Sequence, residues 1–146
     1  MDLLKKYFPQ ITELQVEKFI LFEKLIKEWN NKINLISRKD VENFEVNHLL
    51  HSLSILKFIE FKKDTKILDL GTGGGLPGIP LSIFFPDSKF KLIDRRNKKI
   101  NVLNEIINKL RGYYSAATLL GSTETKVLLF FFLVKTTLPS TNEHKV

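Results

Sequence analysis

The sequence predicts an α/β fold with a parallel sheet, preceded by a helical region. Apolar residues recur with helical spacing through residues 1–60. Beyond a polar joint at residues 62–64, strand patterns and helix patterns alternate, and a glycine-rich turn separates the first strand from its helix. Short joints between such units favour parallel strands. We therefore predict a helical N-terminal region over residues 1–63 and an α/β domain over residues 64–146.

The first long helix is expected to begin at Thr12. The Thr12 side chain can cap the helix, and Gln15 three residues later completes the capping-box pattern. Trp29 continues the apolar face, so we expect it in the core rather than on a base-stacking surface. The residues expected on this face are Leu14, Phe19, Phe22, Leu25, Ile26 and Trp29. A second amphipathic helix is indicated by Leu49, Leu50, Leu53, Leu56 and Ile59.

The α/β part is predicted to begin with a short buried strand over Lys66–Leu70. A helix is expected over residues 79–85, with prolines tolerated only near its first turn. Residues 89–94 alternate as a strand should, and apolar residues between Ile100 and Leu110 mark another helix. The periodicity is lost after Leu110. We expect the C-terminal part from about residue 111 to be atypical and the α/β domain to be incomplete, as in a truncated gene product.

Composition limits the classes of protein and site. The 146 residues are 43% hydrophobic and 27% charged and contain no cysteine, which excludes disulfides, thiolate metal sites and a cysteine nucleophile. The longest apolar run is too short to span a bilayer and no secretory signal is apparent, so we expect a cytoplasmic protein without membrane contact. We predict no metal site, and the oligomeric state is left open.

The formal net charge is +7, and most of the excess is concentrated in one stretch. Eight Lys or Arg residues stand against Asp94 and Glu105 between Lys89 and Arg111. A basic patch of this kind can hold a nucleic-acid backbone, and a solvated helix face is the alternative. The candidate RNA-binding residues are Arg95, Arg96, Lys98 and Lys99.

The turn after the first predicted strand, residues 69–75, reads DLGTGGG. Glycines let the backbone approach a ligand closely and permit positive φ, and the helix that follows directs its positive N-terminal end toward the ligand. Asp94 stands at the end of the next predicted strand, where a carboxylate can accept hydrogen bonds from ribose hydroxyls. The sequence thus predicts a nucleotide-cofactor site. The cofactor-binding candidates in this stretch are Asp69, Gly71, Gly73, Gly75 and Asp94.

The same glycines also match the dinucleotide fingerprint G-x-G-x-x-G over residues 73–78, and that pattern alone is weak. A nicotinamide-dependent oxidoreductase is therefore one alternative. The D-x-G-x-G-x-G spacing that begins at Asp69 is instead similar to motif I of class I methyltransferases, whose turn holds the amino-acid end of S-adenosylmethionine. Asp94 supports a ribose without choosing between the two cofactors.

A longer stretch, DLGTGGGLPGIPL over residues 69–81, resembles the ribosomal RNA small subunit methyltransferase G family, also called the glucose-inhibited division protein B family. Residues 29–38 and 47–53 resemble its helical N-terminal region, and the resemblance covers about residues 10–110. It implies a class I S-adenosylmethionine-dependent, Rossmann-like fold with a helical N-terminal extension. It also implies methyl transfer to N7 of a guanine in 16S ribosomal RNA, free or in the small ribosomal subunit.

The resemblance assigns further positions. The cofactor contacts in the turn correspond to Gly71 and Leu76, and a later contact pair corresponds to Thr123 and Glu124. An arginine of the family has its nearest counterpart in Lys135, which we expect to contact RNA. No side chain is singled out as catalytic, because guanine N7 carries an available lone pair and its methylation depends mostly on placement. A second alternative is a non-catalytic RNA-binding remnant of a truncated methyltransferase.

Overall fold

The computed structural model describes residues 1–112. The helices of the N-terminal region are α1 (Asp2–Tyr7), α2 (Glu13–Asn30), η1 (Arg38–Asp40), η2 (Glu45–Leu50), α3 (His51–Leu53) and η3 (Ser54–Lys57). The α/β part follows as β1 (Lys66–Leu70), α4 (Gly78–Phe84), β2 (Lys89–Ile93) and α5 (Asn97–Gly112). The order of strands and helices predicted from Thr12 onward is therefore confirmed over the described residues, whereas α1 was not predicted.

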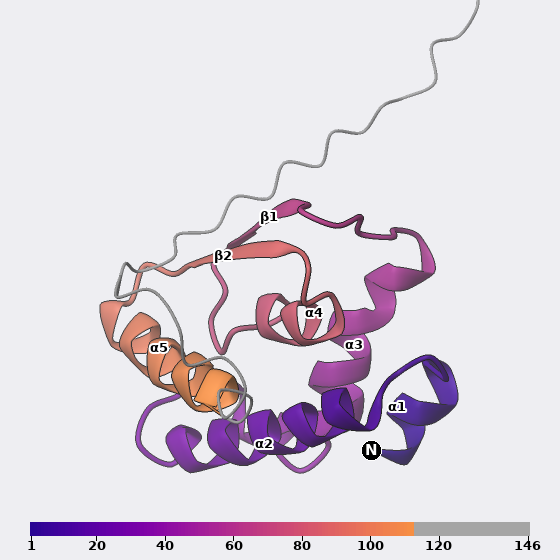
Figure 1. Cartoon of the computed structure of the whole chain (residues 1–146). Helices are drawn as coiled ribbons and strands as arrows, with labels where there is room; N and C mark the ends of the chain where they lie inside the picture. Colours follow the sequence, from indigo (N-terminus) through magenta and orange to yellow (C-terminus); the bar gives the residue numbers. More distant parts are fainter. Residues whose placement is uncertain (113–146) are drawn as a thin grey trace, which may run out of the picture.

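The two strands pair in parallel, as the sequence predicts. Their register sets Ile67 beside Phe90 and Leu70 beside Ile93, so both strands end at the same edge of the sheet. Side chains alternate between the two faces of a strand. Ile67 and Phe90 lie buried on one face, whereas Leu70 on the other face is 76% exposed. Figure 1 shows α4 and α5 on one side of the β1–β2 pair, with α2 beyond them.

Helix α2 begins with the predicted capping box. The Gln15 backbone N–H donates to Thr12 Oγ1 at 3.2 Å, and the Thr12 backbone N–H donates to Gln15 Oε1 at 3.0 Å. The helix buries most of the predicted apolar face, including Phe19 and Phe22. Leu14 departs from the prediction with 47% exposure, whereas Val16 in the same turn is buried. Trp29 is only partly buried at the edge of the core, with the Lys32 ammonium 4.7 Å from its ring centroid.

The second predicted helix is present but irregular. A π-helix over Glu45–Leu50 continues into the single turn α3 and then into the 3₁₀ turn η3. Leu49 and Leu53 are fully buried along it. The His48 ring packs against the ring of Phe44, with 5.3 Å between the ring centroids.

One hydrophobic core joins the helical region to the α/β part. Phe19, Phe22 and Leu49 from the first region cluster with Ile79 and Ile106 from the second. The two predicted regions therefore pack as one unit over the described residues. No described helix combines the length and apolar character that crossing a membrane requires.

Gln15 makes a contact that its capping role does not predict. Its side-chain amide donates to the carbonyl oxygens of Ile83 and Phe84, at 3.1 and 3.0 Å. These carbonyls lie at the end of α4, where backbone acceptors lack partners within the helix. One side chain thus caps the start of α2 and the end of α4.

We predict that Gln15→Glu destabilises the chain, although glutamate retains the acceptor of the capping box. The substitution removes the donors to Ile83 and Phe84 and places a negative charge at the C-terminal end of a helix. We expect a loss of about 1–3 kcal/mol in the free energy of unfolding, measured by urea denaturation. Gln10→Glu, the same change at an exposed residue, is the matched control. Equal effects of the two variants would show that Gln15 does not hold α4.

Candidate cofactor site

The glycine turn begins where β1 ends, and β2 supports it. The backbone N–H groups of Gly71 and Thr72 both donate to the Ile93 carbonyl oxygen, at 2.7 and 2.9 Å. Gly71, Gly73 and Gly75 have φ angles of 79°, 58° and 83°. At Gly75 a Cβ atom would also lie 2.5 Å from Cδ1 of Ile79. This position therefore requires glycine both for its backbone conformation and for lack of space.

Asp69 lies beneath the turn and ties it to α4. Its Oδ2 accepts hydrogen bonds from the Thr72 hydroxyl at 2.7 Å and from the Gly78 backbone N–H at 2.9 Å. Gly78 has no room for a side chain, because a Cβ atom would lie 2.6 Å from that same oxygen. The first N–H of α4 is thus directed at Asp69. This helix end was expected to face a ligand, but the Asp69 carboxylate on β1 already accepts its first N–H.

Burial raises the pKa of the Asp69 carboxyl, and the nearby charge of Asp94 acts in the same direction. The hydrogen bonds from Thr72 and Gly78 oppose this shift without cancelling it. The folded chain therefore holds the Asp69 proton more tightly than an unfolded chain would.

Asp94 follows β2 directly and lies against the turn. Its Oδ2 accepts the Gly73 backbone N–H at 2.9 Å, and its Oδ1 accepts the Arg96 backbone N–H at 2.8 Å. Partial burial alone would raise its pKa, but these two N–H groups and the cations of Lys99 and Arg96 lower the pKa overall. Asp94 is therefore an ionised acceptor at neutral pH, and it is held beside Gly73.

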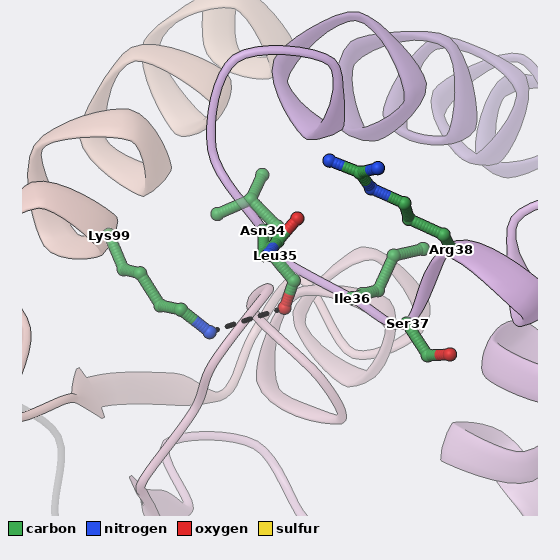
Figure 2. Close-up of a pocket in the computed structure, with 6 residues that line it drawn as sticks. All are labelled: Asn34, Leu35, Ile36, Ser37, Arg38 and Lys99. Carbon is green, nitrogen blue, oxygen red and sulfur yellow. Dashed lines mark hydrogen bonds between the residues drawn. The ribbon is translucent and has the colours of Figure 1, made fainter.

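A loop that sequence reasoning missed also packs on the turn. Residues 31–37 connect α2 to η1, and a Cβ atom on Gly74 would lie only 2.9 Å from Cγ2 of Ile36. The Lys99 ammonium donates to the Leu35 carbonyl oxygen at 3.3 Å, as Figure 2 shows. Only the family resemblance singles out residues 29–38 in the sequence. Their contact with the turn left no local signal.

The loop and the start of α5 line two adjoining cavities of about 340 and 370 Å³. Asn34 and Lys99 line both of them. In Figure 2 the Lys99 side chain points to the loop backbone, whereas the Arg38 guanidinium lies on the other side of the loop. The two cations therefore do not converge on one point.

The basic residues of this stretch are spread from the start of β2 to the end of α5. Lys89, at the opposite end of β2 from the turn, pairs with Asp64 at 3.1 Å. Arg111 is near the end of α5, a 16-residue helix roughly 24 Å long. Arg95 and Lys98 lie near the turn, are exposed and form no ion pair with another described residue. Of the eight basic residues in this stretch, the four nearest the turn in the chain are Arg95, Arg96, Lys98 and Lys99.

Of the remaining candidate site residues, two lie in the described part of the chain and three do not. Gly71 is exposed, and a Cβ atom there would meet nothing within 4 Å. Leu76 is partly buried against the core, and its N–H donates to the Thr72 carbonyl at 3.0 Å. Thr123, Glu124 and Lys135 lie outside the described residues.

We predict that Asp69→Asn preserves the turn and that Asp69→Ala disrupts it. Asparagine keeps an acceptor for Thr72 and Gly78, whereas alanine leaves both donors without one at a cost of about 1–3 kcal/mol in unfolding free energy. Because the pKa of Asp69 is raised, its ionisation destabilises the folded chain as the pH rises through that pKa. The stability of Asp69→Asn relative to wild type should therefore increase from acid to neutral pH in urea titrations. A relative stability that decreases over this range would contradict the prediction.

Comparison with known proteins identifies the family. The family model for rRNA small subunit methyltransferase G, GidB, matches residues 15–117. A relative from Bacteroides thetaiotaomicron, named ribosomal RNA small subunit methyltransferase G, is 47% identical over 134 residues, which are 92% of this chain and 65% of the relative. Relatives of the same name from Christiangramia forsetii and Bacteroides fragilis are 53% and 52% identical over 106 and 110 residues, 73% and 75% of this chain.

The chain spans about half to two thirds of the length of these relatives, with 65%, 50% and 53% of them covered. The match of 134 residues is longer than the 112 that the structure describes, so it continues beyond α5. The turn, Asp69 and Asp94 all lie inside the family match, which covers well over half of the chain. The chain therefore belongs to the rRNA small subunit methyltransferase G family.

Proposed function

We propose that the chain is part of an S-adenosylmethionine-dependent methyltransferase that acts on N7 of a guanine in 16S ribosomal RNA. The observation that carries the proposal is the glycine turn held against Asp94 in a member of this family. Residues 64–146 belong, in this proposal, to a Rossmann-like methyltransferase domain that residues 1–63 precede as a helical extension. Its partner is 16S rRNA or the small ribosomal subunit, in the cytoplasm.

The described residues fit S-adenosylmethionine. A side chain at Gly71 would project into open space at the edge where β1 and β2 end, and this is the space that a cofactor needs. Each carboxylate oxygen of Asp94 accepts one N–H group and keeps capacity for a further donor such as a ribose hydroxyl. In this proposal Gly71, Gly73, Gly75 and Leu76 line the cofactor in the turn, Asp69 supports the turn, and Asp94 holds the ribose.

When bound, S-adenosylmethionine supplies an electrophilic methyl group that the N7 lone pair of guanine can accept without a general base. The task of the protein is then to orient the two reactants. Arg95, Arg96, Lys98 and Lys99 can hold the RNA by contacts to phosphates, which makes RNA binding sensitive to salt. Thr123 and Glu124 as cofactor contacts, and Lys135 as an RNA contact, belong to the same proposal and rest on the resemblance alone.

Family membership favours a methyltransferase over the two alternatives. The G-x-G-x-x-G overlap at residues 73–78 is the feature that an oxidoreductase would need, and it lies inside the family match. An RNA-binding remnant without turnover would keep salt-sensitive RNA binding but would not bind the methyl donor or its product.

The function is tested by calorimetric titration of the purified chain with S-adenosylhomocysteine, the demethylated product, and with NAD as the control. We expect binding of S-adenosylhomocysteine alone. Binding of NAD alone would overturn the proposal in favour of an oxidoreductase. Binding of neither ligand by a chain that circular dichroism shows to be folded would favour the RNA-binding remnant.

We predict that Asp94→Ala weakens S-adenosylhomocysteine binding by about 1–3 kcal/mol, the scale of hydrogen bonds to a charged group. The substitution also removes the acceptor of Gly73 N–H, so the ribose role needs a second comparison. An analogue that lacks both ribose hydroxyls should lose affinity for wild type, but lose little more for Asp94→Ala. Additive losses would show that Asp94 holds the turn and does not touch the ribose.

A further inference from the structure

We propose that Asn30 is a positioning residue for the cofactor turn, acting through the loop of residues 31–37. The inference rests on the proposed cofactor site and assigns a role to a residue that makes no contact with that site. Asn30 is the last residue of α2 and is 7% exposed. A buried amide side chain at the end of a helix is costly unless it is hydrogen-bonded, so its partners indicate what it does.

The Asn30 side chain holds the loop through a single atom. Its Oδ1 accepts the backbone N–H groups of Leu35 at 2.8 Å and of Ile36 at 3.1 Å. Two consecutive N–H groups that share one acceptor are fixed in direction as well as in position. The loop conformation at Leu35 and Ile36 is therefore set from the core side by Asn30.

Leu35 and Ile36 also lie against the glycine turn, on the side of the loop that faces away from Asn30. A Cβ atom on Gly74 would lie 2.9 Å from Cγ2 of Ile36 and 3.4 Å from the Leu35 carbonyl oxygen. That carbonyl also accepts a hydrogen bond from the ammonium of Lys99, a residue of α5. The loop thus lies directly against the turn, and a shift of Leu35 and Ile36 must be met by the turn or open a gap beside it.

Gly73 connects this contact to the proposed ribose acceptor. Its N–H donates to Asp94 Oδ2, and a Cβ atom on Gly73 would lie 3.9 Å from the Lys99 ammonium and 4.0 Å from the Leu35 carbonyl oxygen. Asn30 therefore acts on Gly73 and Gly74 through Leu35 and Ile36. Loss of the Asn30 acceptor should loosen the turn without removing any cofactor contact.

The first test compares Asn30→Leu, which keeps the branched shape of the side chain and removes the acceptor, with Asn30→Asp, which keeps the acceptor. The matched control is Asn108→Leu, the same change at an exposed position on α5. Amide hydrogen exchange of the full chain is followed by NMR at Leu35, Ile36, Gly73 and Gly74. We expect Asn30→Leu to accelerate exchange about tenfold at all four amides. Asn30→Asp should restore slow exchange, and Asn108→Leu should resemble wild type.

The second test measures the affinity of the same variants for S-adenosylhomocysteine by calorimetry. We expect Asn30→Leu to weaken S-adenosylhomocysteine binding about three- to tenfold, with recovery in Asn30→Asp. Faster exchange at Leu35 and Ile36 with unchanged exchange at Gly73 and Gly74 would overturn the proposal, because Asn30 would then hold only its own loop. If wild type binds no S-adenosylhomocysteine, the proposed function fails, while the exchange data still decide whether Asn30 positions the turn.

If Asn30→Leu does not fold, the contact between Gly74 and Ile36 can be tested by enlarging the first residue and reducing the second. Gly74 has no positive φ, so Gly74→Ala tests space rather than backbone strain. We expect Gly74→Ala to accelerate exchange at Gly73, and Ile36→Ala in the same chain to reverse most of that effect by removing the crowding methyl group. Purely additive effects of the two substitutions would show that the loop does not control the turn.

Discussion

The parallel register that sets Leu70 beside Ile93 decides where the groups of the candidate site lie. Because both strands end at one edge, the turn that leaves β1 and the acid that follows β2 come together without a long connection. The Ile93 carbonyl holds the first two N–H groups of the turn, and Asp94 holds the N–H of Gly73. A shift of one residue in this register would separate the turn from Asp94 and reverse the buried face of β2.

The second constraint is the close approach of neighbouring side chains to the backbone of the turn, which glycine permits at Gly75 and Gly74. At Gly75 the backbone conformation and the contact with Ile79 both exclude a side chain. At Gly74 the backbone is unexceptional, and the constraint is the loop that lies against it. The glycine-rich turn is therefore shaped by its protein neighbours as well as by its own backbone conformation.

Asp69 and Asp94 carry the same carboxyl group, but their surroundings shift its pKa in opposite directions. Asp69 lies beneath the turn, where burial raises its pKa and its bonds to Thr72 and Gly78 are structural. Asp94 is held by two backbone N–H groups near cations, so its pKa is lowered and it remains an ionised acceptor. Perturbed pKa values cluster at functional sites, where burial and neighbouring groups shift them. This division supports the proposed roles of the two residues in cofactor binding.

The sequence by itself determined the strands, the two helices after them, the capping box of α2 and the placement of Asp94 beside the turn. Each depends on local periodicity or on a short connection, so neighbouring residues carry the signal. Only the tertiary structure decided that the loop of residues 31–37 lies on Gly74, that Lys99 holds Leu35, and that the Gln15 amide caps α4. These contacts join residues far apart in the chain, and they exist because the core packs α2 against α4 and α5. It also decided that Leu14 stays exposed on the same helix that buries Phe19 and Phe22, because a helix side chain is buried only where another element covers it.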